Sequence, residues 1–145
     1  MVHHPGAVSV VPVVNTGTPT VIMVRQYRAA VDRELLEIPA GKRDVEGEEI
    51  EVLARRELEE EIGMRAGELV KLAEFYNSPG FCDEHSFVFM ALDLTATTTA
   101  AQGIEEQHMT LERIALADVP RLIATGELVD AKSIVGLTLA RERLT

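Results

Sequence analysis

The sequence predicts an α/β fold in which a mixed sheet is sandwiched between helices. The main observation is the order of the segments, which runs from strand-like apolar runs to one strong helix, then to further strands and finally to helices. The length of 145 residues suits one domain. A hydrophobic content of 46% and a mean hydropathy of +0.07 provide enough apolar side chains for a core. We therefore expect a single domain over residues 1–145.

Five strands are expected, each an apolar run bounded by turn residues. They cover residues 7–14, 20–27, 68–76, 85–94 and 109–115. A shorter apolar run at 35–38 is broken by the Pro-Ala-Gly sequence that follows it. The first strand pair is joined by a turn that contains glycine and proline.

Three helices complete the expected order. The first begins near Gly47 or Glu48, where acidic residues favour the positive end of the helix dipole, and it ends at Gly63. Two further helices are predicted over residues 116–125 and 131–143. The first helix carries the most informative pattern in the chain.

That helix has four glutamates in five consecutive positions. With 3.6 residues per turn, Glu57 and Glu61 fall on the face that also carries Leu53 and Ala54, and Glu60 lies beside them. Like charges at this spacing cost roughly 0.2–0.5 kcal/mol per pair even on an exposed helix. A cation would neutralise them, and an all-oxygen ligand set suits magnesium or manganese.

A solvated helix face is the alternative interpretation of these glutamates. Arg55 and Arg56 could form ordinary surface ion pairs with them. Glu59 points away from the apolar face and is expected to be such a surface residue. Glu57 and Glu61 fit this alternative poorly, because solvated charges should not align with apolar residues.

Residues 56–64, Arg-Glu-Leu-Glu-Glu-Glu-Ile-Gly-Met, resemble the signature half of the Nudix box. Glu48 stands eight positions before Arg56, as in that family. Gly41 is separated from Glu48 by six residues, one more than the family pattern has. The additional residue falls in the loop before the helix, so the register of the glutamates is unchanged.

The resemblance implies an α/β/α Nudix fold, metal-dependent hydrolysis and a set of site residues. Arg56 would orient the carboxylates, while Glu48 would either hold Arg56 or be a plain acid at the helix start. The cofactor would be Mg²⁺, with Mn²⁺ as the other choice. The implied metal ligands are Glu57 and Glu61, with Glu60 as auxiliary ligand and the backbone carbonyl of Ala40 completing the site.

A general base is expected in the loop of residues 103–108. Glu105 or Glu106 is the candidate base or additional metal ligand, as the family's use of this loop implies. The alternative is a solvated turn. The sequence leaves open which of the two glutamates would act.

Three further segments resemble the ADP-ribose pyrophosphatases within the family. They are residues 24–28 with 37–41, residues 78–84, and residues 127–133. Pro79 lies sixteen residues beyond Gly63, a spacing typical of that group. The resemblance implies hydrolysis of ADP-ribose or a similar ADP-sugar to AMP and a sugar phosphate. Arg28, Glu84 and Pro79 are the expected substrate-binding residues.

Other functions remain open on the sequence. The substrate could be a nucleoside triphosphate, a dinucleotide or another nucleotide sugar, and a non-catalytic nucleotide-binding module is a third hypothesis.

Family members of this type usually carry several strands before the segment that resembles His4–Val8, and these strands help to form a homodimer. A homodimer is the expectation that the resemblance implies for this chain. His3 and His4 are expected to lie in a flexible end, and Tyr27 and Phe81 to pack rather than stack on a base.

Composition excludes several partners. A net charge of −10 and an isoelectric point near 4.8 argue against binding to nucleic acid or to an anionic membrane. The sequence shows no leader or membrane-spanning run, and Cys82 is the single cysteine. We therefore expect a cytoplasmic enzyme whose partner is a small nucleoside diphosphate.

Overall fold

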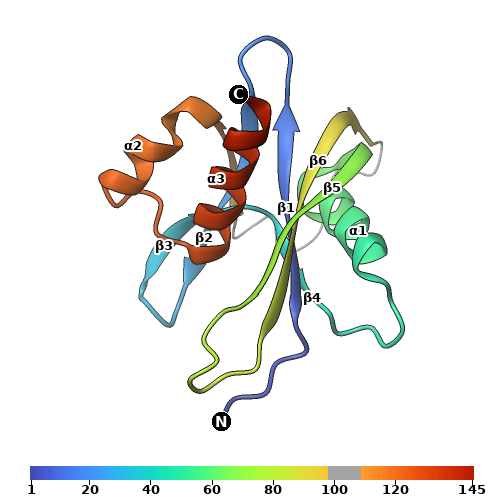
Figure 1. Ribbon diagram of the computed structural model, residues 1–145, viewed down its shortest axis with the longest axis vertical. Helices are drawn as coiled ribbons and strands as arrows, with labels where there is room; N and C mark the ends of the chain where they lie inside the picture. The colour runs from blue at the N-terminus through green and yellow to red at the C-terminus, as the bar shows by residue number, and fades with distance from the viewer. Residues whose placement is uncertain (98–108) are drawn as a thin grey trace.

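The computed structural model describes residues 1–97 and 109–145, and it confirms an α/β sandwich with a mixed sheet (Figure 1). Seven strands form the sheet in this described part of the chain. They are β1 (Ala7–Val14), β2 (Thr20–Arg28), β3 (Arg33–Glu37), β4 (Ala40–Lys42), β5 (Met64–Tyr76), β6 (His85–Ala96) and β7 (Met109–Ala115).

Strand β1 lies at the centre of the sheet. It pairs in parallel with β6 from Ala7 opposite Ser86 to Pro12 opposite Ala91, and antiparallel with β4 along its first residues. Its last residues pair with β2, which in turn pairs with β3 and β7. The short strand β4 is therefore held beside the start of β1, where the site described below is found.

The helices cover both faces of the sheet. Helix α1 (Ile50–Ile62) lies on one side, and α2 (Val119–Ala124) and α3 (Ala131–Leu144) lie on the other (Figure 1). Alternate residues of β1 supply the two cores, because successive side chains of a strand point to opposite faces. Val8 and Val10 pack with α1, whereas Val11 and Val13 pack with the α2 and α3 residues.

Most of the predicted elements are confirmed, with differences at several boundaries. Strand β5 begins at Met64, four residues before the predicted start at residue 68. Residues 40–42 form β4 where a break was predicted. The first helix begins at Ile50 instead of Gly47 or Glu48, since Glu49 is still extended. The region predicted as one helix at 116–125 divides into a 3₁₀ turn, Leu116–Asp118, and α2.

Gly63 ends α1 as predicted. It adopts a left-handed conformation with φ 67°, and its N–H bonds back to the carbonyl of Glu59. This conformation suits glycine because a Cβ would be strained there. Strand β5 then starts at once, so that α1 packs directly against it. No helix in the described residues is long and apolar enough to cross a membrane.

Candidate active site

The side chain of Glu57 lies against the backbone of Gly41. A Cβ built on Gly41 would lie 2.5 Å from Glu57 Cγ and closer still to the carboxylate. No side chain therefore fits at position 41 while Glu57 keeps its place. The Glu57 side chain is only 12% exposed. Burial, followed by the charge of Glu60, raises the pKa of Glu57 to about 7, although Arg56 opposes this.

Glu61 follows one helical turn later and is more strongly perturbed. Burial, followed by the charge of Glu57, raises its pKa to about 8, against a backbone hydrogen bond from Ala40 and the charge of Lys132. Its Oε2 atom is buried and has no hydrogen-bond partner among the residues that the structure describes. A buried carboxylate oxygen that lacks a partner is costly, and such an atom indicates a missing ligand or a functional role.

Arg56 is held at the edge of this acidic pair. Its guanidinium donates two hydrogen bonds to Glu48, from Nε to Oε2 at 3.0 Å and from Nη2 to Oε1 at 2.9 Å. Its Nη1 lies 3.7 Å from Glu57 Oε1 and 3.3 Å from Glu60 Oε2. The structure thus shows Glu48 fixing Arg56, which was one of the two roles considered for it.

The carboxylates at this site fit a divalent cation. Glu57 and Glu61 carry hard oxygen ligands. The Oε2 atom of Glu61, which bonds to no other described residue, is available to bind such a cation. Glu60 is different, because its side chain is 56% exposed and paired with Arg56. Within residues 1–97 and 109–145, no three histidine, cysteine, aspartate or glutamate side chains are already grouped to hold a metal ion.

Next to Glu61 the surface opens into a cavity of about 410 Å³. Ala40 and Gly41 of β4 line it together with Glu61. One wall comes from the ends of β2 and β3 and the start of α3, and the other from the N-terminal segment and the β5–β6 hairpin. A cavity of this size suits a small ligand.

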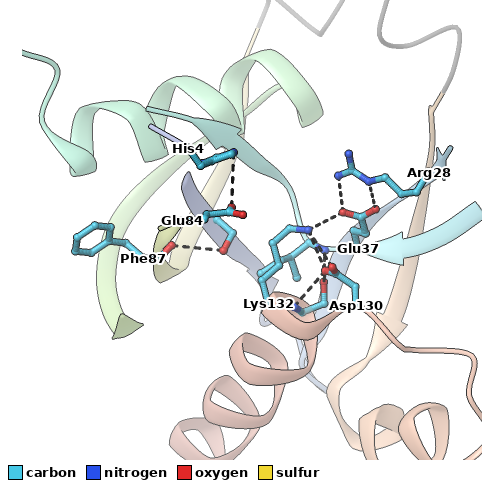
Figure 2. Close-up of polar contacts among 10 residues, drawn as sticks. His4, Arg28, Glu37, Glu84, Phe87, Asp130 and Lys132 are labelled. Carbon is cyan, nitrogen blue, oxygen red and sulfur yellow. Dashed lines mark hydrogen bonds and ion pairs between the residues drawn. The ribbon is translucent and has the colours of Figure 1, made fainter. Parts of the chain in front are cut away.

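The first wall is built around Glu37 (Figure 2). Its carboxylate is buried, and the residue is 1% exposed. Arg28 donates two hydrogen bonds of 2.8 Å to it, and Lys132 Nζ donates a third at 2.6 Å. Burial alone would raise the pKa of Glu37, but these two cations outweigh it and hold the pKa below its ordinary value. Glu37 therefore stays ionised and orients two cations at the cavity.

Asp130 ties this network to the start of α3. Its carboxylate accepts hydrogen bonds from Lys132 Nζ at 3.0 and 3.1 Å, and from the backbone N–H of Ser133 at 3.3 Å as the N-cap of the helix. The hydroxyl of Ser133 donates to Asp130 and accepts from the N–H of Ile38 at 2.9 Å. Strand β3 and helix α3 are thus joined at the site.

The opposite wall carries His4 and Glu84 (Figure 2). His4 Nε2 lies 3.9 Å from Glu84 Oε2, and both side chains are partly exposed, at 22% and 24%. His4 was expected in a flexible end, and this expectation is wrong. Its backbone N–H donates to Asp83 Oδ1 at 2.7 Å, which fixes it against the hairpin.

Some of the predicted site residues line the cavity, and others do not. Arg28, Glu84, Ala40 and Glu61 all line the cavity, although they come from four different segments. Pro79 is exposed and is not among the lining residues. Glu105 and Glu106 lie outside the described residues.

Several site residues were missed, and two aromatic residues were wrongly expected to pack. Sequence reasoning did not single out Glu37, Lys132 or Asp130, although the short spacing of Asp130, Lys132 and Ser133 is a helix-cap signal. Tyr27 and Phe81 are 52% and 60% exposed, so neither is a core residue.

Known proteins resemble this chain over most of its length. The family model of the NUDIX domain matches residues 3–134. The "ADP-ribose pyrophosphatase" of Bacillus subtilis (strain 168) is 42% identical over 133 residues, which are 92% of this chain and 70% of that protein. The "Methanol dehydrogenase activator" of Bacillus methanolicus is 35% identical over 137 residues, or 94% of this chain and 72% of that protein.

A solved structure extends the comparison to three dimensions. The crystal structure of an ADP compounds hydrolase superposes with a TM-score of 0.82 at 27% identity, covering 96% of this chain and 72% of the other. The family model, the sequence relatives and the fold therefore agree. The chain belongs to the Nudix family of pyrophosphohydrolases.

Proposed function

We propose that this protein hydrolyses the diphosphate linkage of ADP-ribose or a similar ADP-sugar, in a reaction that depends on a divalent cation, to give AMP and a sugar phosphate. The observation that carries the proposal is the pair Glu57 and Glu61. Both have a raised pKa. Glu61 lies beside a cavity of about 410 Å³, and its buried oxygen has no hydrogen-bond partner within residues 1–97 and 109–145.

The relatives and the cavity walls support the choice of substrate. One relative is named ADP-ribose pyrophosphatase, and a structural neighbour is described as an ADP compounds hydrolase. Arg28 and Lys132 place two cations on one side of the cavity, which suits a phosphate group. Glu84 supplies an acceptor on the other side, which suits hydroxyl groups.

Different residues are assigned to binding the cation, to positioning its ligands and to binding the substrate. Glu57 and Glu61, with Glu60 as auxiliary ligand and the carbonyl of Ala40, would hold the cation. When bound, the cation would offset the charge of the diphosphate and polarise a phosphoryl oxygen. Arg56, fixed by Glu48, keeps the Glu57 carboxylate in position. Glu37 orients Arg28 and Lys132 toward the substrate.

The proton acceptor belongs to the same proposal. Attack of water on phosphorus requires a base, and we assign this role to Glu105 or Glu106 on the strength of the family resemblance. The variants Glu105→Gln and Glu106→Gln distinguish the two. The base should show a fall in kcat with little change in KM, whereas a solvated residue should show neither effect.

Magnesium is the proposed cation, with manganese as the second choice, because the ligands are all oxygens. A cytoplasmic location is proposed from the single cysteine. A homodimer is proposed from the family resemblance alone. Light scattering of the purified protein decides the last point, since a monomer mass at micromolar concentration would reject it.

A substrate panel tests the central proposal. The panel contains ADP-ribose, other ADP-sugars, GDP-sugars, dinucleotides and nucleoside triphosphates, each assayed with magnesium or manganese. We expect the highest kcat/KM for ADP-ribose or another ADP-sugar, with AMP as a product. Turnover of nucleoside triphosphates but not of ADP-sugars would reject this substrate class.

A further inference from the structure

The N-terminal segment is fixed along the tip of the β5–β6 hairpin. The N–H of Val2 donates to the carbonyl of Phe81 at 2.6 Å, and the N–H of Asp83 donates to the carbonyl of Val2 at 3.2 Å. The backbone N–H of His4 also bonds to this hairpin, donating to the Asp83 carboxylate at 2.7 Å. These bonds hold the His4 ring at the cavity wall.

The state of the His4 ring follows from its own hydrogen bonds. The N–H of Gly6 donates to His4 Nδ1 at 3.0 Å, so this nitrogen must be an acceptor and cannot carry a proton. The neutral ring therefore has its proton on Nε2. That N–H is the donor that His4 presents at the cavity, where its neighbour is Glu84.

The pair His4 and Glu84 is spaced for a bridging group. Their 3.9 Å separation between Nε2 and Oε2 is too long for a direct hydrogen bond, which requires about 2.7–3.2 Å. A hydroxyl can bridge such a gap, since it accepts one hydrogen bond and donates another. A phosphate oxygen cannot do so, because it has no proton to give to the Glu84 carboxylate.

We infer that His4 Nε2–H and Glu84 together bind a hydroxyl of the sugar half of the substrate, so that His4 is a specificity-determining residue. The assignment rests on the proposed function, because it uses the sugar of a nucleoside diphosphate sugar. The distribution of charge in the cavity agrees with this assignment. Arg28 and Lys132 line the opposite wall, where they suit the phosphate groups of a substrate, so the wall with His4 and Glu84 suits its uncharged hydroxyl groups.

A comparison of two substrates and three variants tests this role. The substrates are ADP-ribose and the butyl ester of ADP, whose distal group has no hydroxyl. Glutamine places a side-chain N–H close to the position of Nε2, whereas asparagine reaches only that of Nδ1. His4→Asn and His4→Gln are therefore the test variants. His3→Asn is the control, since His3 is bound to Asp83 and does not line the cavity.

We expect His4→Asn to lower kcat/KM for ADP-ribose by about tenfold or more, and to change kcat/KM for the butyl ester by less than about twofold. His4→Gln should recover part of the loss, and His3→Asn should behave as wild type. An equal fall for both substrates would indicate a purely structural role. Unchanged discrimination in His4→Asn would also overturn the inference.

A binding measurement separates this inference from the proposed activity. In ¹⁵N-labelled protein, the neutral His4 ring should show a proton on Nε2 and none on Nδ1. Ribose 5-phosphate should shift the His4 Nε2 resonance clearly more than butyl phosphate, which lacks hydroxyls. If wild type fails to hydrolyse ADP-ribose but this difference is seen, the proposed function is wrong and the hydroxyl site stands. Equal shifts, or a proton on Nδ1, would overturn the hydroxyl site.

Discussion

Glu57 occupies the space that a side chain at position 41 would need. The Gly41 backbone of β4 and the Glu57 side chain of α1 are in direct contact, so glycine at position 41 is a steric requirement of the acidic pair. The glycine that opens the Nudix box and the glutamate near its end are thus joined by packing. The extra residue in the intervening loop does not disturb this contact.

Gly41→Ala should therefore displace Glu57. We expect a loss of at least about tenfold in kcat, and a fall of about 1–3 kcal/mol in the free energy of unfolding from overpacking. Steady-state kinetics and urea unfolding measure the two effects. Gly80→Ala is the matched control, because a Cβ at Gly80 meets nothing within 4 Å. Wild-type activity in Gly41→Ala would show that the contact is not needed.

Stability of the metal-free protein should depend on pH through Glu61. Its pKa is raised from 4.5 to about 8, so the folded protein keeps a proton that the unfolded chain has lost. The free energy of unfolding should then fall as pH rises from about 4.5 to about 8, with a limiting slope near −1.4 kcal/mol per pH unit from this group. Urea unfolding in the presence of a chelator measures it.

The matched variant for the pH dependence is Glu61→Gln, which removes the titrating group. Its slope between pH 5 and pH 8 should be clearly shallower than that of wild type. Magnesium should stabilise wild type at the upper end of this range and have little effect on the variant. Equal slopes in the two proteins would contradict the raised pKa of Glu61.

Arg56→Lys should weaken the site without unfolding the helix. Lysine cannot make the two parallel hydrogen bonds that Arg56 makes to Glu48, and so it should position Glu57 poorly. We expect kcat to fall by about tenfold while the free energy of unfolding changes by less than about 1 kcal/mol. Arg55→Lys is the control, because Arg55 donates to the Ala66 carbonyl at 2.8 Å, away from the acidic pair. An equal effect of both changes would contradict the assignment.

Glu37→Gln should loosen the cationic wall. The change removes the charge that holds Arg28 and Lys132, and we expect a rise in KM larger than the fall in kcat. The free energy of unfolding should fall by about 1–3 kcal/mol, because hydrogen bonds to a buried charged group are weakened. Glu34→Gln is the control, because Glu34 lies on the same strand and is exposed. A fall in kcat alone would argue against a role in substrate binding.

The sequence could reveal those parts of the site that depend on local periodicity. The register of α1 aligns Glu57 and Glu61 with its buried residues Leu53 and Ala54, and the period of the helix is enough to predict this alignment. The end of the helix at Gly63 is equally local, because a left-handed cap favours glycine.

Other parts depend on contacts between distant segments. Glu37 and Lys132 are 95 residues apart, and no spacing in the sequence relates them. Strand β4 has three residues and follows a proline, and it is a strand only because β1 supplies its partners. His4 is ordered by Asp83 across a similar distance in sequence. Tertiary pairing decides these features, and local patterns do not record it.

The most direct test of the proposed activity measures AMP release from ADP-ribose in wild type, Glu57→Gln and Glu61→Gln, with and without magnesium. We expect release by wild type only when the cation is present, and a loss of at least about a hundredfold in both variants. Calorimetry should show weaker magnesium binding in the variants, and circular dichroism should show an unchanged fold. Full activity in both variants, or equal activity of wild type in a chelator, would contradict the central claim.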